Sequence, residues 1–405
     1  LKSIKKLGYQ TPTEIQSRVI PLVLEGKDVL GRAQTGTGKT AGFILPLLHI
    51  LKNSKQKASP FTPKLLVITP TRELADQVHK NAVNYGQYLE LKTALVYGGV
   101  PIHTQIRKLK KGVDILIATP GRLLDHLNQK TIDLSSTQNI VLDEADSMLD
   151  MGFIHDIRKI LSKLPEKRQT LLFSATFTKS IRKLADDLLM QPEVVEVHES
   201  NSVSEQVEQK IHPVDRGRKS ELLNHLIQEN DWPQVLVFTR TKQTADRLCK
   251  NLRESKVRTD VIHGDKPQRV RSRALRSFKD GKVQILVATD IAARGLDIHH
   301  LPCVINFELP FVASDYVHRI GRTGRAGNQG TAISLVSKDE RKLMGAIEQF
   351  IKIPVNRSIV QGFEVDKTLD PVPSKSKKKS SAGFKGKSNK KPRKSNSAVK
   401  KRAVK

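Results

Sequence analysis

The sequence predicts an α/β protein made of two tandem domains, each a parallel sheet covered by helices on both faces. Short continuous apolar runs, rich in β-branched residues, recur along the chain, and each is followed by a helix-like segment. Such unbroken apolar runs are typical of parallel strands that are buried on both faces. The series also restarts part-way along the 405 residues, of which 38% are hydrophobic. A chain of this length and composition can form two cores.

The expected strands fall into two series, and a polar segment rich in Ser, Gln and Glu separates them. In the first series they span residues 28–32, 65–69, 114–119, 139–143 and 170–174. In the second they span residues 234–239, 259–263, 283–289, 303–307 and 331–336. We therefore predict a first domain over residues 1–202, a linker over 203–209, a second domain over 210–354 and a C-terminal extension over 355–405.

The extension is expected to be basic and disordered from about residue 374. Residues 374–405 hold 12 Lys and 2 Arg and no Asp or Glu, which is about half of the net charge of +29. Such a composition cannot bury enough apolar surface to offset chain entropy. The charge points to a polyanionic partner, so the tail is interpreted as a tethered polycation. A solubility tail or a targeting signal remains the alternative.

Other bulk features narrow the class of protein. No apolar run approaches the length of about 18 residues that a transmembrane helix needs, so we expect a cytoplasmic protein without a membrane partner. Cys249 and Cys303 are expected to be buried, reduced thiols. Because the first residue is Leu1, we expect that further residues precede it in the natural protein.

A glycine-rich segment between the first expected strand and a helix has the pattern of a phosphate-binding loop. Its backbone N–H groups would converge on phosphate oxygens, and the following helix adds a favourable dipole. Lys39 would reach the β- and γ-phosphates, and the Thr40 hydroxyl would face Mg²⁺. The generic pattern begins with Gly, where this chain has Ala33. The segment runs through Ala33, Gln34, Thr35, Gly36, Thr37, Gly38, Lys39 and Thr40.

An acidic stretch follows a later strand, where α/β sheets place their ligands. The apolar run at residues 139–142 leads into Asp143, Glu144, Ala145 and Asp146. Asp143 would hold Mg²⁺ through water, and Glu144 is placed to accept a proton from an attacking water. Together with the glycine-rich loop, this stretch predicts a nucleotide-hydrolysing site.

Several further segments occur in a fixed order around these two motifs. They span residues 8–16, 70–75, 98–99, 119–122, 174–176, 268–271, 288–297 and 318–325. With these segments the chain resembles the DEAD-box family of ATP-dependent RNA helicases from about Gly8 to Pro354. The compact basic domains, the lysine tail and the absence of extra enzymatic modules most resemble the bacterial RhlE-type branch. The resemblance implies two RecA-like domains, ATP and Mg²⁺ as cofactors and RNA as the partner.

The resemblance also implies roles for individual residues at the nucleotide. Gln16, supported by Thr11, would read the adenine edge, and Asp297 would contact the ribose. Arg322 and Arg325 would act as arginine fingers. Ser174 and Thr176 would couple hydrolysis to strand separation through hydroxyls that meet Asp146, and His318 belongs to the same coupling set.

The RNA contacts that the resemblance implies lie in both domains. In the first domain they are Arg72, Gly98, Gly99, Thr119, Pro120, Gly121 and Arg122. In the second they are Gln268, Arg271, Thr289 and Gly295. Glycine, threonine and arginine in loops suit phosphates and sugars, and aromatic residues make up only 4% of the chain. We therefore expect weak sequence preference.

These expectations combine into one mechanism. The lysine and the arginine fingers lie in different domains, so hydrolysis requires the domains to close, and RNA in the same cleft would favour closure. We expect a monomeric RNA-dependent ATPase that unwinds short RNA duplexes locally or remodels RNA–protein complexes. Two alternatives remain: an ATP-regulated RNA clamp or assembly scaffold, and a DNA-directed motor of the same superfamily.

Overall fold

The computed structural model describes residues 2–33, 36–54, 58–197, 207–296, 298, 301–324 and 330–365. The chain divides into two compact units, residues 1–365 and 366–405, and every described residue belongs to the first. Predictions for Gln34, Thr35, Asp297, Arg325 and the basic tail therefore lie outside the described residues.

The first half of the described chain forms a seven-stranded parallel sheet with the strand order β3-β4-β2-β5-β6-β1-β7. Its central strands are buried along their whole length, as the continuous apolar runs predict. The strands are β1 (Val29–Arg32), β2 (Leu65–Ile68), β3 (Thr93–Val96), β4 (Ile115–Ala118), β5 (Asn139–Leu142), β6 (Gln169–Ser174) and β7 (Glu193–Glu196).

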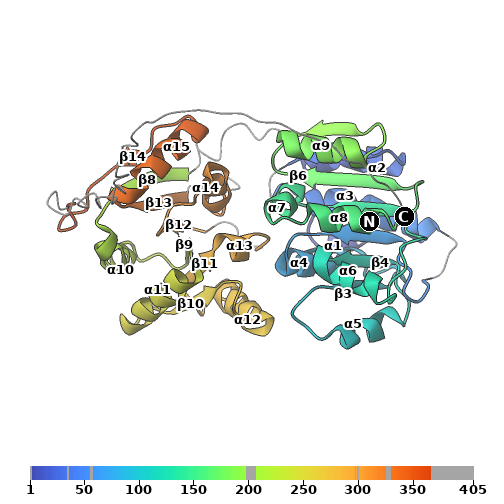
Figure 1. Ribbon diagram of the computed structural model, residues 1–405, viewed down its shortest axis with the longest axis horizontal. Helices are drawn as coiled ribbons and strands as arrows, with labels where there is room; N and C mark the ends of the chain where they lie inside the picture. The colour runs from blue at the N-terminus through green and yellow to red at the C-terminus, as the bar shows by residue number, and fades with distance from the viewer. Residues whose placement is uncertain are drawn as a thin grey trace, which may run out of the picture. The chain divides into compact units, whose positions relative to one another are not determined.

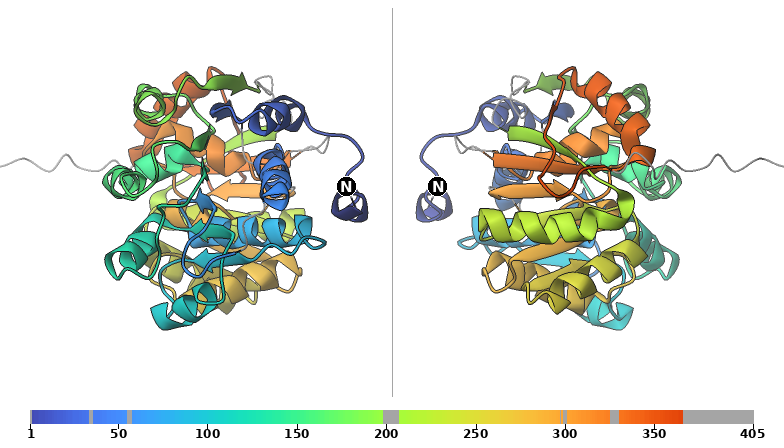
Figure 2. Two further views of the ribbon diagram at one scale, coloured as in Figure 1. Left: turned by 90° about the vertical axis from the view of Figure 1, so that its right-hand side faces the viewer. Right: turned by 90° about the vertical axis from the view of Figure 1, so that its left-hand side faces the viewer.

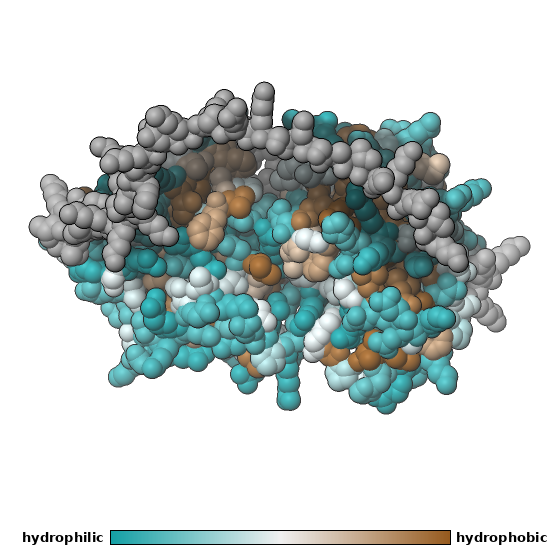
Figure 3. Space-filling model, viewed as in Figure 1, coloured by the Kyte–Doolittle hydropathy of each residue, from teal (hydrophilic) through white to brown (hydrophobic). Residues whose placement is uncertain are grey.

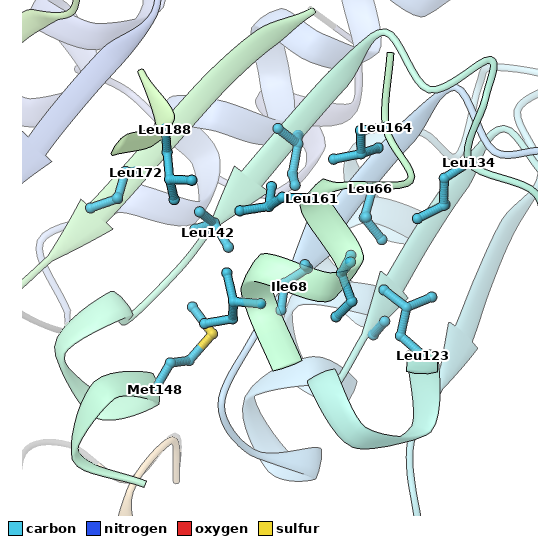
Figure 4. Close-up of a cluster of buried hydrophobic side chains, with 14 of the residues drawn as sticks. Leu66, Ile68, Leu123, Leu134, Leu142, Met148, Leu161, Leu164, Leu172 and Leu188 are labelled. Atoms are coloured by element: carbon cyan, nitrogen blue, oxygen red, sulfur yellow. The ribbon is translucent and has the colours of Figure 1, made fainter. Parts of the chain in front are cut away.

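Helices cover both faces of this sheet (Figure 1). One core lies beneath α2 (Glu14–Leu24), α3 (Lys39–Asn53) and α4 (Arg72–Tyr85). The other lies beneath α6 (Pro120–Asn128), α7 (Ala145–Asp150), α8 (Ile154–Leu161) and α9 (Lys179–Leu188). Figure 4 shows how the leucine-rich side chains of this second core interlock, with Met148 of α7 at its edge. Two short helices, α1 (Lys2–Lys6) and α5 (Ile102–Leu109), complete this half.

A second seven-stranded parallel sheet follows, with the order β10-β11-β9-β12-β13-β8-β14. Its strands are β8 (Val207–Pro213), β9 (Val235–Thr239), β10 (Thr259–Ile262), β11 (Ile285–Thr289), β12 (Cys303–Asn306), β13 (Gly330–Val336) and β14 (Asn356–Arg357). Its main helices are α10 (Lys219–Asn230), α11 (Lys242–Glu254), α12 (Gln268–Lys279), α13 (Asp290–Ala293), α14 (Ala313–Ile320) and α15 (Arg341–Ile351). Figure 2 shows these helices beside the strands from two further sides.

The two sheets confirm the predicted α/β architecture, and their strands extend past two of the expected boundaries. Strand β8 begins at Val207, so the last three residues of the predicted linker are strand. They pair with β13, and Val207 and Ile211 are buried between polar neighbours. The fold also continues beyond residue 354, because β14 pairs with β8 and Phe363 is buried in the core beneath α10 and α11.

No helix among the described residues is long and apolar enough to cross a membrane. Cys249 and Cys303 are buried free thiols, as predicted.

Candidate functional site

The candidate site lies at the carboxyl ends of three neighbouring strands of the first sheet, in the order β5, β6 and β1. The loop after β1 is the glycine-rich segment, β5 leads into Asp143 and Glu144, and β6 leads into the segment that holds Thr176. Segments that are far apart in sequence therefore meet at one edge, where parallel sheets place their ligands.

The glycine-rich loop bends in a way that its glycines make possible. Gly36 and Gly38 have φ values of 92° and 93°, in the left-handed region that other residues rarely adopt. A Cβ on Gly38 would lie 2.4 Å from Nε2 of Gln16. Lys39 follows as the first residue of α3 and is 5% exposed, and its Nζ has no hydrogen-bond partner among the described residues. A buried ammonium without hydrogen-bond partners is costly, and phosphate oxygens in the loop would supply such partners.

Gln16, the predicted adenine contact, lies against this loop. Its Oε1 accepts a hydrogen bond from Thr13 N at 3.1 Å, and its Nε2 donates to Gly38 O at 3.1 Å. Each end of the amide retains capacity for one further hydrogen bond. Thr11, the second predicted adenine contact, is exposed.

The acidic residues after β5 are buried beside Lys39. Asp143 is 2% exposed and Glu144 is 6% exposed, and Asp143 Oδ1 accepts a hydrogen bond from Glu144 N at 3.0 Å. Burial raises the pKa of both carboxyls, and the charge of Lys39 opposes that rise. Glu144 has a φ of 55°, a left-handed conformation that is uncommon for non-glycine residues.

Asp146 connects the acidic stretch to the end of β6. Its Oδ2 accepts hydrogen bonds from Ala175 N and Thr176 N, both at 3.0 Å, and from Thr176 Oγ1 at 3.3 Å. The expectation that both hydroxyls meet Asp146 is wrong for Ser174. The Ser174 hydroxyl instead donates to Thr176 O at 2.8 Å and shapes the turn.

Arg322 lies in the turn after α14 in the second half of the chain, and its charge acts on Glu144, as that of Lys39 does. It is 6% exposed, and its Nη1 donates to Leu296 O at 2.8 Å. Its charge, with that of Lys39, opposes the burial that raises the pKa of Glu144. A cavity of about 250 Å³ is lined by residues from both halves, including Gly36, Gly38, Lys39, Thr40, Asp143 and Glu144 with Gly295 and Leu296.

A second constellation gathers predicted RNA contacts around Arg72. Arg72 Nη1 donates to Gln268 Oε1 at 3.3 Å, and its guanidinium packs against Gly98 and Gly99. A Cβ on Gly99 would lie 2.2 Å from that Nη1. Burial lowers the pKa of Arg72, and the charges of Arg271 and Arg122 lower it further. Arg72 therefore lies within the electrostatic influence of two further guanidiniums.

The other predicted RNA contacts lie near the glycine pair or at the first residues of helices. Arg122 Nη1 donates to Val100 O at 2.9 Å, just beyond the glycine pair. Thr119 and Pro120 begin α6, and Gly121 has open space where a Cβ would stand. Gly295, with a φ of 70°, approaches Thr71 so closely that a Cβ would lie 2.3 Å from its Oγ1. Thr289 precedes α13, and Nδ1 of His318 lies 3.8 Å from Oδ1 of Asp315.

The sequence analysis missed several residues that hold these groups in place. Glu73 Oε1 accepts from Gln268 Nε2 and from Arg271 Nη2, both at 2.9 Å. Arg319 forms a buried two-pronged ion pair with Asp290, and Arg294 contacts Asp150 at 3.2 Å and Asp315 at 2.7 Å. Each lies within a quoted motif or a few residues from one, but nothing in the sequence indicates which acid meets which base.

Comparisons with known proteins agree with this geometry. The DEAD/DEAH box helicase family matches residues 13–184, and the helicase conserved C-terminal domain matches residues 218–327. The chain is 44% identical to the DEAD-box ATP-dependent RNA helicase CshA of Bacillus subtilis, over 88% of this chain and 71% of that protein. The chain belongs to the DEAD-box ATP-dependent RNA helicase family.

Solved structures give the same assignment for this DEAD-box helicase. A DEAD box protein from Methanococcus jannaschii is 38% identical, with a TM-score of 0.51, over 88% of this chain and 95% of that one. Dbp5 of Saccharomyces cerevisiae, bound to RNA and ADP BeF3, is 30% identical with a TM-score of 0.78, over 88% and 92% of the two chains. The predictions of tandem RecA-like domains and of an ATP-dependent helicase enzyme are confirmed. The RhlE-type branch stays a prediction.

Proposed function

We propose that this DEAD-box helicase hydrolyses ATP in a site divided between its two sheets, and that bound RNA favours the hydrolysing arrangement. The observation that carries the proposal is the meeting of Lys39, Glu144 and Arg322, three buried groups from distant parts of the chain. Phosphoryl transfer depends on positioning and charge stabilisation. Lys39 would bind the terminal phosphates, and Arg322, with Arg325, would stabilise the charge that develops on the transferred group.

The same site fits a divalent cation such as Mg²⁺. Thr40 and Asp143 present hydroxyl and carboxylate oxygens, the ligand types that Mg²⁺ accepts together with phosphate, and a nearby cation would favour the ionised form of buried Asp143. When bound, the cation would neutralise phosphate charge. Glu144 would hold the proton that the attacking water loses, and Gln16 would bind the adenine edge with support from Thr11.

The cluster around Arg72 supports RNA as the second ligand. The charges of Arg271 and Arg122 both lower the pKa of Arg72, and a phosphate beside Arg72 would offset that repulsion. Glycines at positions 98, 99 and 121 let a backbone approach closely, and Thr119, Pro120, Gln268, Thr289 and Gly295 complete the proposed surface. The similar Dbp5 structure contains RNA. We infer that strand binding here and ATP binding at Lys39 stabilise the same arrangement and thereby separate short duplexes.

Asp146, Ser174, Thr176 and His318 are proposed to transmit the state of the nucleotide to the strand site. The domain boundaries at residues 202, 210 and 354 remain proposals. The start of β8 and the end of β14 give refined positions for the last two of them. The cytoplasmic location stays a prediction.

The variant Glu144→Gln tests the proposed chemistry. The amide keeps the size of the side chain but accepts no proton at neutral pH, so RNA-stimulated ATP turnover is expected to fall by about 10²-fold or more. Binding of a fluorescent ATP analogue and of an RNA oligonucleotide is expected to persist. Turnover within a few-fold of the parent rate would contradict the role of Glu144, and loss of both binding activities would indicate misfolding instead.

A further inference from the structure

Helix α12 carries an exposed row of arginines that the strand site does not use. Arg269, Arg273 and Arg276 are exposed, and their spacing of four and three residues places them on one side of the helix. The opposite side buries Ala274 and Phe278 in the core. We call these three residues the arginine stripe. Figure 1 shows α12 at the end of the second sheet that carries β10 and β11.

The stripe differs from an ordinary solvated charged face because it lacks acidic partners. Helix α12 contains no Asp or Glu, and none of the three arginines forms an ion pair with another described residue. On helix α11, by contrast, Lys250 pairs with Glu254 at 3.8 Å, and Arg253 pairs with Asp260 of β10 at 3.1 Å. Like charges on one face of a helix destabilise it slightly. Among the described residues, no acidic group forms an ion pair that would offset this repulsion.

The stripe begins beside the proposed strand site, because Arg269 directly follows Gln268 at the start of α12, whereas Arg271 is buried on the other side of the helix with Ala274 and Phe278. Figure 3 shows that hydrophilic residues cover much of the molecular surface on the face it presents, with smaller hydrophobic patches between them. From Arg269 to Arg276 the helix rises by about 10 Å at 1.5 Å per residue. The three charges are therefore spread over a length that can face more than one phosphate of an RNA strand.

We propose that the arginine stripe binds the phosphate backbone of RNA that extends beyond the strand site. The proposal rests on the RNA-binding function proposed above and adds a second contact surface to it. Arginine suits this role because its planar fork binds phosphate oxygens in pairs and keeps its charge at every physiological pH. RNA is favoured over an acidic protein because the stripe starts one residue after Gln268, which belongs to the proposed strand site.

The test compares R273Q/R276Q in the full chain with R182Q/K183Q, a control on the exposed face of α9. Both variants remove two positive charges, and neither touches the proposed catalytic or strand residues. Affinity is measured with a non-hydrolysable ATP analogue for a single-stranded RNA of about 6 nucleotides and for one of about 20, across a series of salt concentrations.

For the longer RNA, R273Q/R276Q is expected to reduce the magnitude of the log–log salt slope by about 1.4, or 0.7 for each lost phosphate contact. It should lose most of the affinity gained by lengthening the RNA, while binding of the short RNA and the maximal ATPase rate stay within about twofold. The control should keep the parent slope. An unchanged salt slope in R273Q/R276Q would overturn the proposal and leave an acidic protein as the partner of this face. An equal reduction of the slope in the control would overturn it as well. Failure of the parent protein to bind the short RNA would instead refute the proposed function.

Discussion

His126 illustrates how single buried residues support the proposed strand site without touching it. Its ring is fully buried, with Nε2 3.0 Å from Gln105 Oε1 and Nδ1 2.8 Å from Thr131 Oγ1. Gln105 in turn donates to Tyr97 O at 2.9 Å, next to Gly98 and Gly99. Burial lowers the pKa of His126 to about 4, and the charge of Arg122 lowers it as well. The ring therefore stays neutral and keeps both hydrogen bonds near neutral pH.

This pKa predicts a pH dependence of stability. The unfolded chain binds a proton at His126 below about pH 6.5, whereas the folded protein does so only near pH 4. The free energy of unfolding should therefore fall as pH drops from about 6.5 to 4, by on the order of 3 kcal/mol from this residue. Urea denaturation across that range should show a smaller fall for His126→Gln. The same change at His155, whose ring is exposed, serves as the control, and equal slopes for His126→Gln and the parent would contradict the assignment.

Residues with a strict chemical pattern could be found from the sequence, and residues that depend on three-dimensional neighbours could not. Gly36, Gly38 and Lys39 form a recognisable pattern because a phosphate loop requires left-handed turns and a lysine at fixed spacing. The left-handed backbone of Glu144 and the inward-turned hydroxyl of Ser174 leave no such pattern. Gln105 and His126 are likewise ordinary helix residues until the fold brings them together.

At the scale of elements, the adjacent ends of β5, β6 and β1 explain how the nucleotide site would communicate with the rest of the first sheet. Asp146 on α7 accepts three hydrogen bonds from the segment that follows β6. A shift of the carboxylates after β5 would therefore move Thr176 with α7.

We predict different effects for the two partners of this contact. Asp146→Ala leaves two backbone N–H groups without an acceptor and should lower the free energy of unfolding by about 2–3 kcal/mol, whereas Thr176→Val loses one hydroxyl bond, worth about 1 kcal/mol. In Thr176→Val, which stays folded, duplex displacement per ATP hydrolysed should fall more than the ATPase rate itself. A proportional loss of both would show that the contact has only a structural role.

The central strands were predictable because their apolar runs are continuous, whereas β3, β7, β8 and β14, at or next to the sheet edges, were not predicted. Strands β7 and β8 contain charged residues at exposed positions, since an edge strand has fewer neighbours to bury it. Strand β14 has only two residues, both exposed, and forms because β8 offers a free edge. For this reason the polar composition of residues 203–209 predicted a linker, although the last three of these residues belong to β8.

At the scale of the whole molecule, the proposed function depends on segments that the sequence separates widely. The sequence order of the motifs predicted a divided site, and the influence of Arg322 on Glu144 agrees with that prediction. The sequence did not indicate that the arginines of the second half pair with Glu73, Asp150 and Asp290. Pairing between residues that are far apart in sequence depends on the final packing.

The basic tail adds a prediction at the same scale. Residues 374–405 carry 14 of the chain's basic residues and no acidic ones, so their deletion should raise the RNA concentration needed for half-maximal ATPase activity. The maximal rate should barely change, because a tether raises the local RNA concentration without entering the site. An ATPase titration with RNA measures both quantities, and an unchanged half-maximal concentration would favour a role in solubility or targeting.

The divided site is tested most directly by the single-turnover rate of ATP hydrolysis in Arg322→Ala with saturating ATP and RNA. Arg322→Lys and the thermal midpoint Tm serve as controls, because Arg322 also donates to Leu296 O. Arginine fingers contribute 10³-fold or more to such reactions, so a folded Arg322→Ala should retain ATP binding and lose roughly 10³-fold in rate. A rate within a few-fold of the parent would show that hydrolysis does not depend on Arg322.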